Sequence, residues 1–179
     1  MRRSSDAQPD ASAGRPSKGR SGPGRVLRLV FAAPLRLYEW HLGWLLGHRF
    51  VRLTHYGRRS GRRYQTVLEV VGRDRLGGEL FVMAGFGRTS DWFRNIGANP
   101  QEVEIDVAGG RFVADHRLLG EDEAAQVLFG YEHRNRLVAP VVRRMLARLT
   151  ARPYDGRDAA RREVVRLLPV IAFRPRPPA

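Results

Sequence analysis

Residues 50–85 read FVRLTHYGRRSGRRYQTVLEVVGRDRLGGELFVMAG, and this stretch decides the fold class of the 179-residue chain. Three runs rich in β-forming residues, 50–57, 64–72 and 78–85, are separated by short loops that contain glycine and arginine. Runs of this length and composition, divided by turn residues, are typical of consecutive strands. The stretch therefore predicts the start of an antiparallel meander.

The rest of the chain extends this pattern. Residues 102–120 predict a hairpin that turns at Gly109-Gly110, and residues 164–173 (VVRLLPVIAF) predict a last strand, which Pro169 would confine to an edge or a bulge. A short helix capped by Thr89 or Ser90 is expected between the strands, and a helical pair is expected from Glu121 onward. About six short, mostly antiparallel strands with flanking helices favour an α+β barrel over a doubly wound parallel sheet.

The N-terminal segment of residues 1–25 predicts a disordered basic tail. It is rich in Ser, Gly, Pro and Arg, and it has no large apolar residue after Met1. It also lacks the apolar stretch of a secretory signal, so a cytoplasmic location is expected. Residues 26–179 are expected to form one domain.

Residues 26–46 predict an amphipathic helix, because apolar residues recur at steps of three and four. Charged residues, among them Arg28, Arg36 and Glu39, interrupt the run and argue against a membrane span. The helix is expected to lie on the barrel. A peripheral membrane contact is the alternative, supported by Trp40 and Trp44.

Composition limits the chemistry. The chain has no cysteine, which excludes disulfides, thiolate metal sites and cysteine nucleophiles. The five histidines show no chelating pattern with carboxylates, so no metal is expected. A dinucleotide-binding G-x-G-x-x-G and a hydrolase G-x-S-x-G are both missing from the sequence. A formal net charge of +14 indicates an anionic partner or an arginine-rich, solvated surface.

Two segments have the residue types of a ligand site. In the first, residues 54–63, glycines allow backbone N–H groups to turn toward an anion, Arg58 and Arg59 can pair with it, and Ser60 can donate a hydroxyl. A solvated hairpin turn is the alternative for this segment. In the second, residues 84–95, glycines leave room for a flat ring, and the following helix N-terminus attracts a phosphate.

Two longer runs contain these segments: residues 54–68, with the core G-R-R-S-G, and residues 84–100, with the ending W-F-R-N-I-x-A-N-P. On these runs the chain resembles the deazaflavin (F420)-dependent nitroreductase family over roughly residues 48–175. The resemblance implies a flavin-reductase-like split β-barrel. It also implies an oxidoreductase that transfers a hydride between coenzyme F420 and a small organic acceptor such as an enone, a quinone or a nitro compound. The implied cofactor-binding residues are Arg58, Arg59, Ser60, Gly61, Thr66, Val67, Leu68, Ala84, Gly85, Gly87, Arg88, Trp92 and Asn95.

Other assignments stay open at this point. Tyr131 is the candidate catalytic residue on the substrate side, with a core role as its alternative. FMN on the same barrel is the second cofactor hypothesis, although a polyglutamate tail on F420 would match the arginines better. A basic nucleic-acid-binding protein is the less favoured third hypothesis. A monomer is expected.

Overall fold

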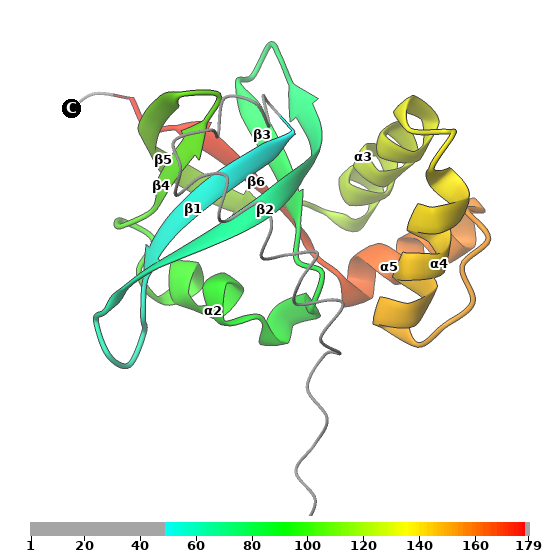
Figure 1. Ribbon diagram of the computed structural model, residues 1–179, viewed down its shortest axis with the longest axis horizontal. Helices are drawn as coiled ribbons and strands as arrows, with labels where there is room; N and C mark the ends of the chain where they lie inside the picture. The colour runs from blue at the N-terminus through cyan, green and yellow to red at the C-terminus, as the bar shows by residue number, and fades with distance from the viewer. Residues whose placement is uncertain (1–48, 178–179) are drawn as a thin grey trace, which may run out of the picture.

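The computed structural model describes residues 49–177. Six strands form a closed barrel in the order β1-β2-β3-β6-β5-β4, with every neighbouring pair antiparallel (Figure 1). The strands are β1 Phe50–Tyr56, β2 Arg63–Asp74, β3 Glu79–Met83, β4 Glu104–Val107, β5 Gly110–Leu118 and β6 Val170–Pro175. The predicted α+β split barrel is confirmed. The tail predicted for residues 1–25 and the helix predicted for 26–46 lie outside the described residues.

The helices lie in two places around the barrel. A 3-10 turn, η2 (Gly87–Thr89), leads into α2 (Asp91–Ala98), which lies across one end of the barrel (Figure 1). The other three helices, α3 (Glu121–Arg134), α4 (Ala139–Thr150) and α5 (Asp158–Leu167), group together on one side. Between residues 49 and 177, no helix has the length and apolar character needed to cross a membrane.

The strand predicted for residues 164–173 is wrong in its first half. Helix α5 extends to Leu167, and β6 begins only at Val170, after Pro169. Leu168 leaves helical geometry (φ −116°, ψ 83°), as residues before proline commonly do. The strand that follows is central, since it pairs with both β3 and β5, so the predicted edge position is also wrong. Pro169 is tolerated because it lies before the ladder.

The predicted cap of α2 differs in its chemistry. Ser90 is the N-cap residue, but neither candidate hydroxyl caps the helix. The Thr89 hydroxyl donates to the carbonyl oxygen of Phe86, and the Ser90 hydroxyl donates to that of Gly87, each at 2.9 Å. These bonds stabilise the 3-10 turn and so fix the approach to α2.

Two hydrophobic clusters hold the fold together. The barrel interior contains Leu53, Ile105 and Phe173, and α2 closes its end with Trp92 and Ile96. The second cluster lies between the helices and the outer face of the sheet.

A buried carboxylate joins the three side helices. Glu132 of α3 is 4% exposed and accepts hydrogen bonds from Arg143 of α4, from Arg161 of α5 and from the Tyr154 hydroxyl. Arg161 also lies 5.0 Å from the centre of the Phe129 ring. This ion cluster satisfies the buried charge, which would otherwise be costly.

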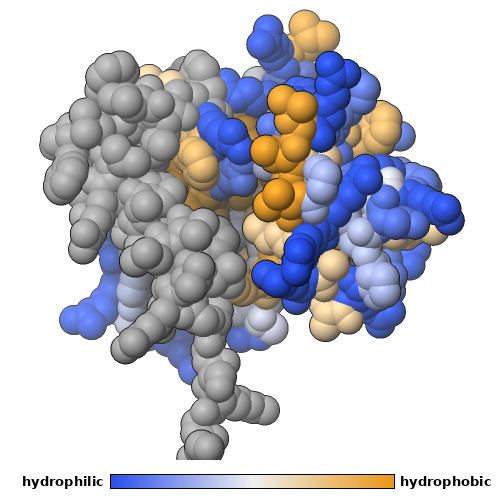
Figure 2. All heavy atoms as spheres, turned by 45° about the vertical axis from the view of Figure 1, so that its right-hand side comes forward, coloured by the Kyte–Doolittle hydropathy of each residue, from blue (hydrophilic) through white to orange (hydrophobic). Residues whose placement is uncertain are grey.

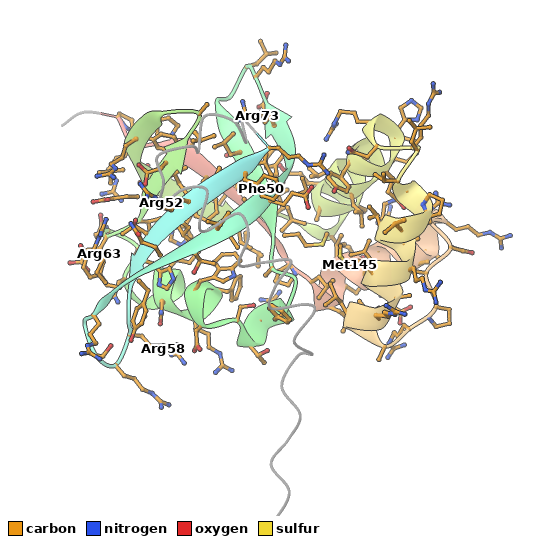
Figure 3. The ribbon with its side chains drawn as sticks, viewed as in Figure 1. Phe50, Arg52, Arg58, Arg63, Arg73 and Met145 are labelled. Atoms are coloured by element: carbon orange, nitrogen blue, oxygen red, sulfur yellow. The ribbon has the colours of Figure 1, made fainter. Side chains whose placement is uncertain are left out.

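Charged and apolar side chains are both exposed on the surface. Arg52, Arg58 and Arg63 lie on the side of β1 and β2, whereas Met145 lies among the helices (Figure 3). On the helical side, an apolar stripe passes between charged side chains (Figure 2). Helix α4 carries Val141 and Met145 as exposed apolar residues on this side of the molecule.

Candidate active site

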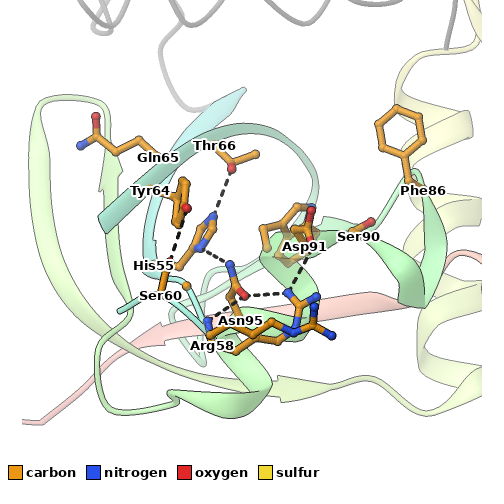
Figure 4. Close-up of a pocket in the computed structure, with 13 residues that line it drawn as sticks. His55, Arg58, Ser60, Tyr64, Gln65, Thr66, Phe86, Ser90, Asp91 and Asn95 are labelled. Atoms are coloured by element: carbon orange, nitrogen blue, oxygen red, sulfur yellow. Dashed lines mark hydrogen bonds and ion pairs between the residues drawn. The ribbon is translucent and has the colours of Figure 1, made fainter. Parts of the chain in front are cut away.

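A cavity of about 490 Å³ opens between the β1–β2 loop, η2 and the start of α2 (Figure 4). All lining residues lie between residues 55 and 95, and most of them belong to the two segments singled out in the sequence. The lining residues are His55, Gly57, Arg58, Arg59, Ser60, Tyr64, Gln65, Thr66, Phe86, Ser90, Asp91, Trp92 and Asn95.

The hairpin register places three polar side chains on one face. His55 of β1 pairs with Tyr64 of β2, and their rings stack with centroids 5.9 Å apart. Thr66 lies two residues further along β2, so it faces the same way as Tyr64 and is a diagonal neighbour of His55. The loop between the strands is tight at Gly57, where a Cβ atom would come within 2.6 Å of the Ser60 hydroxyl oxygen.

Asn95 fixes this loop against α2. Its Oδ1 accepts from the backbone N–H of Arg58 at 3.2 Å and from the guanidinium of Arg58 at 2.9 Å. Its Nδ2 lies 3.1 Å from Nδ1 of His55. The same guanidinium donates to Asp91 at 3.0 Å. Asn95 is 3% exposed, so it functions as a buried connection between loop, strand and helix.

Acidification is expected to weaken this network through His55. Burial lowers the pKa of His55 below its usual value, and nearby Asp91 offsets part of that effect. Histidine titrates at about pH 6.5 in an unfolded chain. The stability that neutral His55 provides is therefore fully present above that pH, and it is lost as the pH falls toward the lower folded pKa.

The melting temperatures of the wild type and His55→Phe between about pH 8 and about pH 5 test this expectation. The advantage of the wild type should shrink as the pH falls. Parallel profiles would contradict it. The comparison isolates His55, because both proteins share the other relevant groups. These are Arg58 and Asp91 of the network and the partly buried His116.

Six of the thirteen predicted cofactor-binding residues line the cavity. They are Arg58, Arg59, Ser60, Thr66, Trp92 and Asn95. Gly61 adopts the left-handed conformation (φ 61°) that shapes the loop. Val67 and Leu68 continue β2 beyond Thr66 and are half-buried.

Several backbone N–H groups of the arginine loop (residues 57–62) already have partners within the protein. The N–H groups of Gly57, Ser60 and Gly61 close the loop on itself by donating to carbonyl oxygens within it. The N–H of Arg58 donates to Asn95. These N–H groups are engaged within the protein, and the exposed side chain of Arg59 is the candidate group for binding an anion.

The glycine loop (residues 84–88) is packed more closely than the sequence suggested. Ala84 is fully buried in the barrel core. Gly87 has φ 64°, and a Cβ atom there would come within 2.8 Å of the Leu167 carbonyl oxygen. Gly85 and the exposed Arg88 also lie outside the cavity lining. Between Ala84 and the start of α2, the residues that line the cavity are Phe86 and Ser90.

Tyr131 lies away from the cavity. Its hydroxyl donates to Glu69 of β2 at 2.8 Å, and Arg49 pairs with the same carboxylate. Burial, together with the Glu69 carboxylate, raises the pKa of Tyr131. Within residues 49–177 its contacts are those of a core residue, and its catalytic role stays a prediction.

Several lining residues were not among the predicted ones. Tyr64 and Phe86 are 45% and 50% exposed and present aromatic surface at the cavity. His55, Gln65 and Asp91 add polar groups. The strand alternation around the loop was the signal for His55 and Tyr64, because a β1–β2 hairpin places them opposite each other.

Residues 38–153 match the profile of the F420H2-dependent quinone reductase family. Comparison with curated proteins gave no match. Among solved structures, an F420H2-dependent reductase is 20% identical over 72% of this chain and 96% of that chain, with a TM-score of 0.45. A domain-swapped dimer is 17% identical (83% and 98% covered, TM-score 0.48). A pyridoxamine 5′-phosphate oxidase-related, FMN-binding protein from Nostoc punctiforme is 18% identical (87% and 81%, TM-score 0.42).

Proposed function

The chain belongs to the F420H2-dependent quinone reductase family, and we propose that it transfers a hydride between coenzyme F420 and a small quinone-like acceptor at the cavity beside α2. Membership of this family makes the chain an oxidoreductase that uses coenzyme F420. An enone or a nitro compound is the alternative acceptor.

The cavity supports this proposal because it combines positive charge with exposed aromatic surface. Arg58 and Arg59 supply the charge that the phosphate and the acidic tail of F420 require. Tyr64 and Phe86 offer faces on which a flat ring can stack. Thr66 adds a polar contact for ring heteroatoms. The residues present therefore fit this cofactor.

The protein's part in the reaction is orientation and electrostatics. When bound, the deazaflavin supplies or accepts the hydride. Asn95 and Asp91 hold the Arg58 guanidinium in place, so this charge is positioned before a ligand arrives. Arg59 is exposed and lines the cavity, which makes it the principal side chain for the anionic part of the cofactor.

The other cofactor and partner hypotheses receive less support. FMN has one phosphate and no glutamate tail, so it makes less use of the arginine loop. Binding of nucleic acid would need a wide basic and aromatic surface, whereas the exposed aromatic residues beside the arginine loop, Tyr64 and Phe86, line a single cavity. The monomeric state and a membrane contact through residues 26–46 stay predictions.

Titration of the full chain with oxidised F420 and, in parallel, with FMN tests the proposal, using tryptophan fluorescence because Trp92 lines the cavity. We expect tighter binding of F420 than of FMN. In a separate assay that starts from reduced F420H2, the protein should catalyse hydride transfer to a soluble quinone, which yields oxidised F420 and the hydroquinone. Nitro and enone compounds should react more slowly. Preferential binding of FMN, or F420H2 that no quinone oxidises, would contradict the proposal.

A further inference from the structure

The hydrogen bonds of Asn95 determine which of its side-chain atoms faces His55. Oδ1 receives two donors from Arg58, its backbone N–H and its guanidinium, so this atom must be the acceptor. The other amide atom, Nδ2, is therefore the one that lies 3.1 Å from Nδ1 of His55. Since Nδ2 carries only donor hydrogens, Nδ1 of His55 must accept.

This acceptor role determines the tautomer of His55. A neutral imidazole has one protonated nitrogen, and with Nδ1 accepting, the proton is on Nε2. Nε2 lies 3.3 Å from the hydroxyl oxygen of Thr66. His55 therefore donates to Thr66 and does not accept from it (Figure 4).

The same logic extends to the Thr66 hydroxyl. Its oxygen accepts from His55, which leaves its own hydrogen to be donated elsewhere. Both residues line the cavity, but Thr66 is half-buried whereas His55 is only 3% exposed, so Thr66 is the more accessible of the two to a ligand. Among residues 49–177, the contact with His55 is the side-chain hydrogen bond of Thr66.

We propose that His55, held by Asn95, is a positioning residue that makes Thr66 a hydrogen-bond donor toward an acceptor atom, a carbonyl oxygen or ring nitrogen, of the bound deazaflavin. This inference rests on the proposed function, because it assumes that the F420 ring occupies this cavity. Each residue of this hydrogen-bonded chain donates to the next, from the Asn95 amide to His55 and from His55 to Thr66. The Thr66 hydroxyl is then left to donate into the cavity. A donor of this kind binds an electron-rich acceptor more tightly than a neutral one, so it favours the reduced ring.

The tautomer can be tested without any cofactor. In the full chain labelled with ¹⁵N-histidine, long-range ¹H–¹⁵N spectra at neutral pH should show His55 with protonated Nε2 and unprotonated Nδ1. In Asn95→Leu this preference should weaken. A wild-type His55 protonated at Nδ1 would overturn the inference.

The donor role can be tested with matched variants of Thr66. Thr66→Val keeps the branched shape but loses the hydroxyl, and it should weaken binding of oxidised F420 by about tenfold. It should also shift the absorption maximum of bound F420 and lower its reduction potential. Thr66→Ser, which keeps the hydroxyl, should restore all three. Wild-type affinity and an unchanged spectrum in Thr66→Val would overturn the inference.

A double-mutant cycle tests whether His55 acts through Thr66. His55→Phe keeps the ring that stacks on Tyr64 but lacks both nitrogens, and it should weaken F420 binding about as much as Thr66→Val. The double variant should lose no more than either single variant. Additive losses, with all variants folded by circular dichroism, would overturn the inference. Failure of the wild type to bind F420 would overturn the proposed function as well, whereas these other outcomes leave that function standing.

Discussion

Replacing Arg59 by alanine is expected to weaken F420 binding by about 10- to 100-fold, since charge-assisted hydrogen bonds contribute about 1.5–3 kcal/mol. Arg59 lines the cavity and is exposed, so its guanidinium can reach the phosphate or the acidic tail of the cofactor. Folding stability should not change. Fluorescence titration of the wild type and the variant measures the loss, and added salt should reduce the difference between them.

Arg88→Ala is the matched control for this prediction. Arg88 is an exposed arginine of the second segment that lies outside the cavity lining. Its removal should alter F420 binding much less than removal of Arg59. If Arg88→Ala instead gives the larger loss, the anionic part of the cofactor binds at the glycine loop and the assignment of Arg59 is wrong.

Replacing Glu132 by alanine is expected to destabilise the protein by about 3–5 kcal/mol, the usual cost of removing one partner from a buried ion pair. The carboxylate receives hydrogen bonds from Arg143, Arg161 and Tyr154, and Arg161 is itself only 6% exposed. Without Glu132, the Arg161 charge would stay buried with less compensation. Urea unfolding followed by circular dichroism measures the free energy.

Two further variants separate the buried charge from general effects. Glu163→Ala removes an exposed carboxylate of α5 that pairs with Arg152, and it should change the free energy of unfolding by less than about 1 kcal/mol. Tyr154→Phe removes one hydrogen bond to Glu132 and should cost about 1 kcal/mol. A loss in Glu132→Ala no larger than in Glu163→Ala would contradict a stabilising role for the ion cluster.

The strands were predictable because their signals are local. The runs at 50–57, 64–72 and 78–85 became β1, β2 and β3 with ends shifted by no more than two residues. Helix α5 was missed because its first residues are mostly charged and its second half contains the β-branched pair Val164 and Val165. Its helical character comes from burial of Val164 and Val165 in the cluster between the helices, a tertiary effect that the local sequence does not show.

The site was predictable to a smaller extent. The arginine loop and the start of α2 do meet, as the sequence suggested, and Arg58 and Asn95 are in direct contact. The glycines at 85 and 87 suggested an open surface, whereas Gly87 packs against the end of α5. That contact joins residues far apart in the chain, so spacing alone could not reveal it. The link from His55 to Asn95 likewise depends on how α2 packs under the barrel.

The position of β6 has a consequence for the order in which the protein can assemble during synthesis. β6 follows every other strand in the sequence, yet it lies between β3 and β5. A growing chain on the ribosome must therefore carry two unpaired strand edges until residues 170–175 emerge and insert between them. Unpaired edges of this kind readily join to other chains. Insertion of β6 is therefore the step that closes the barrel and removes both edges.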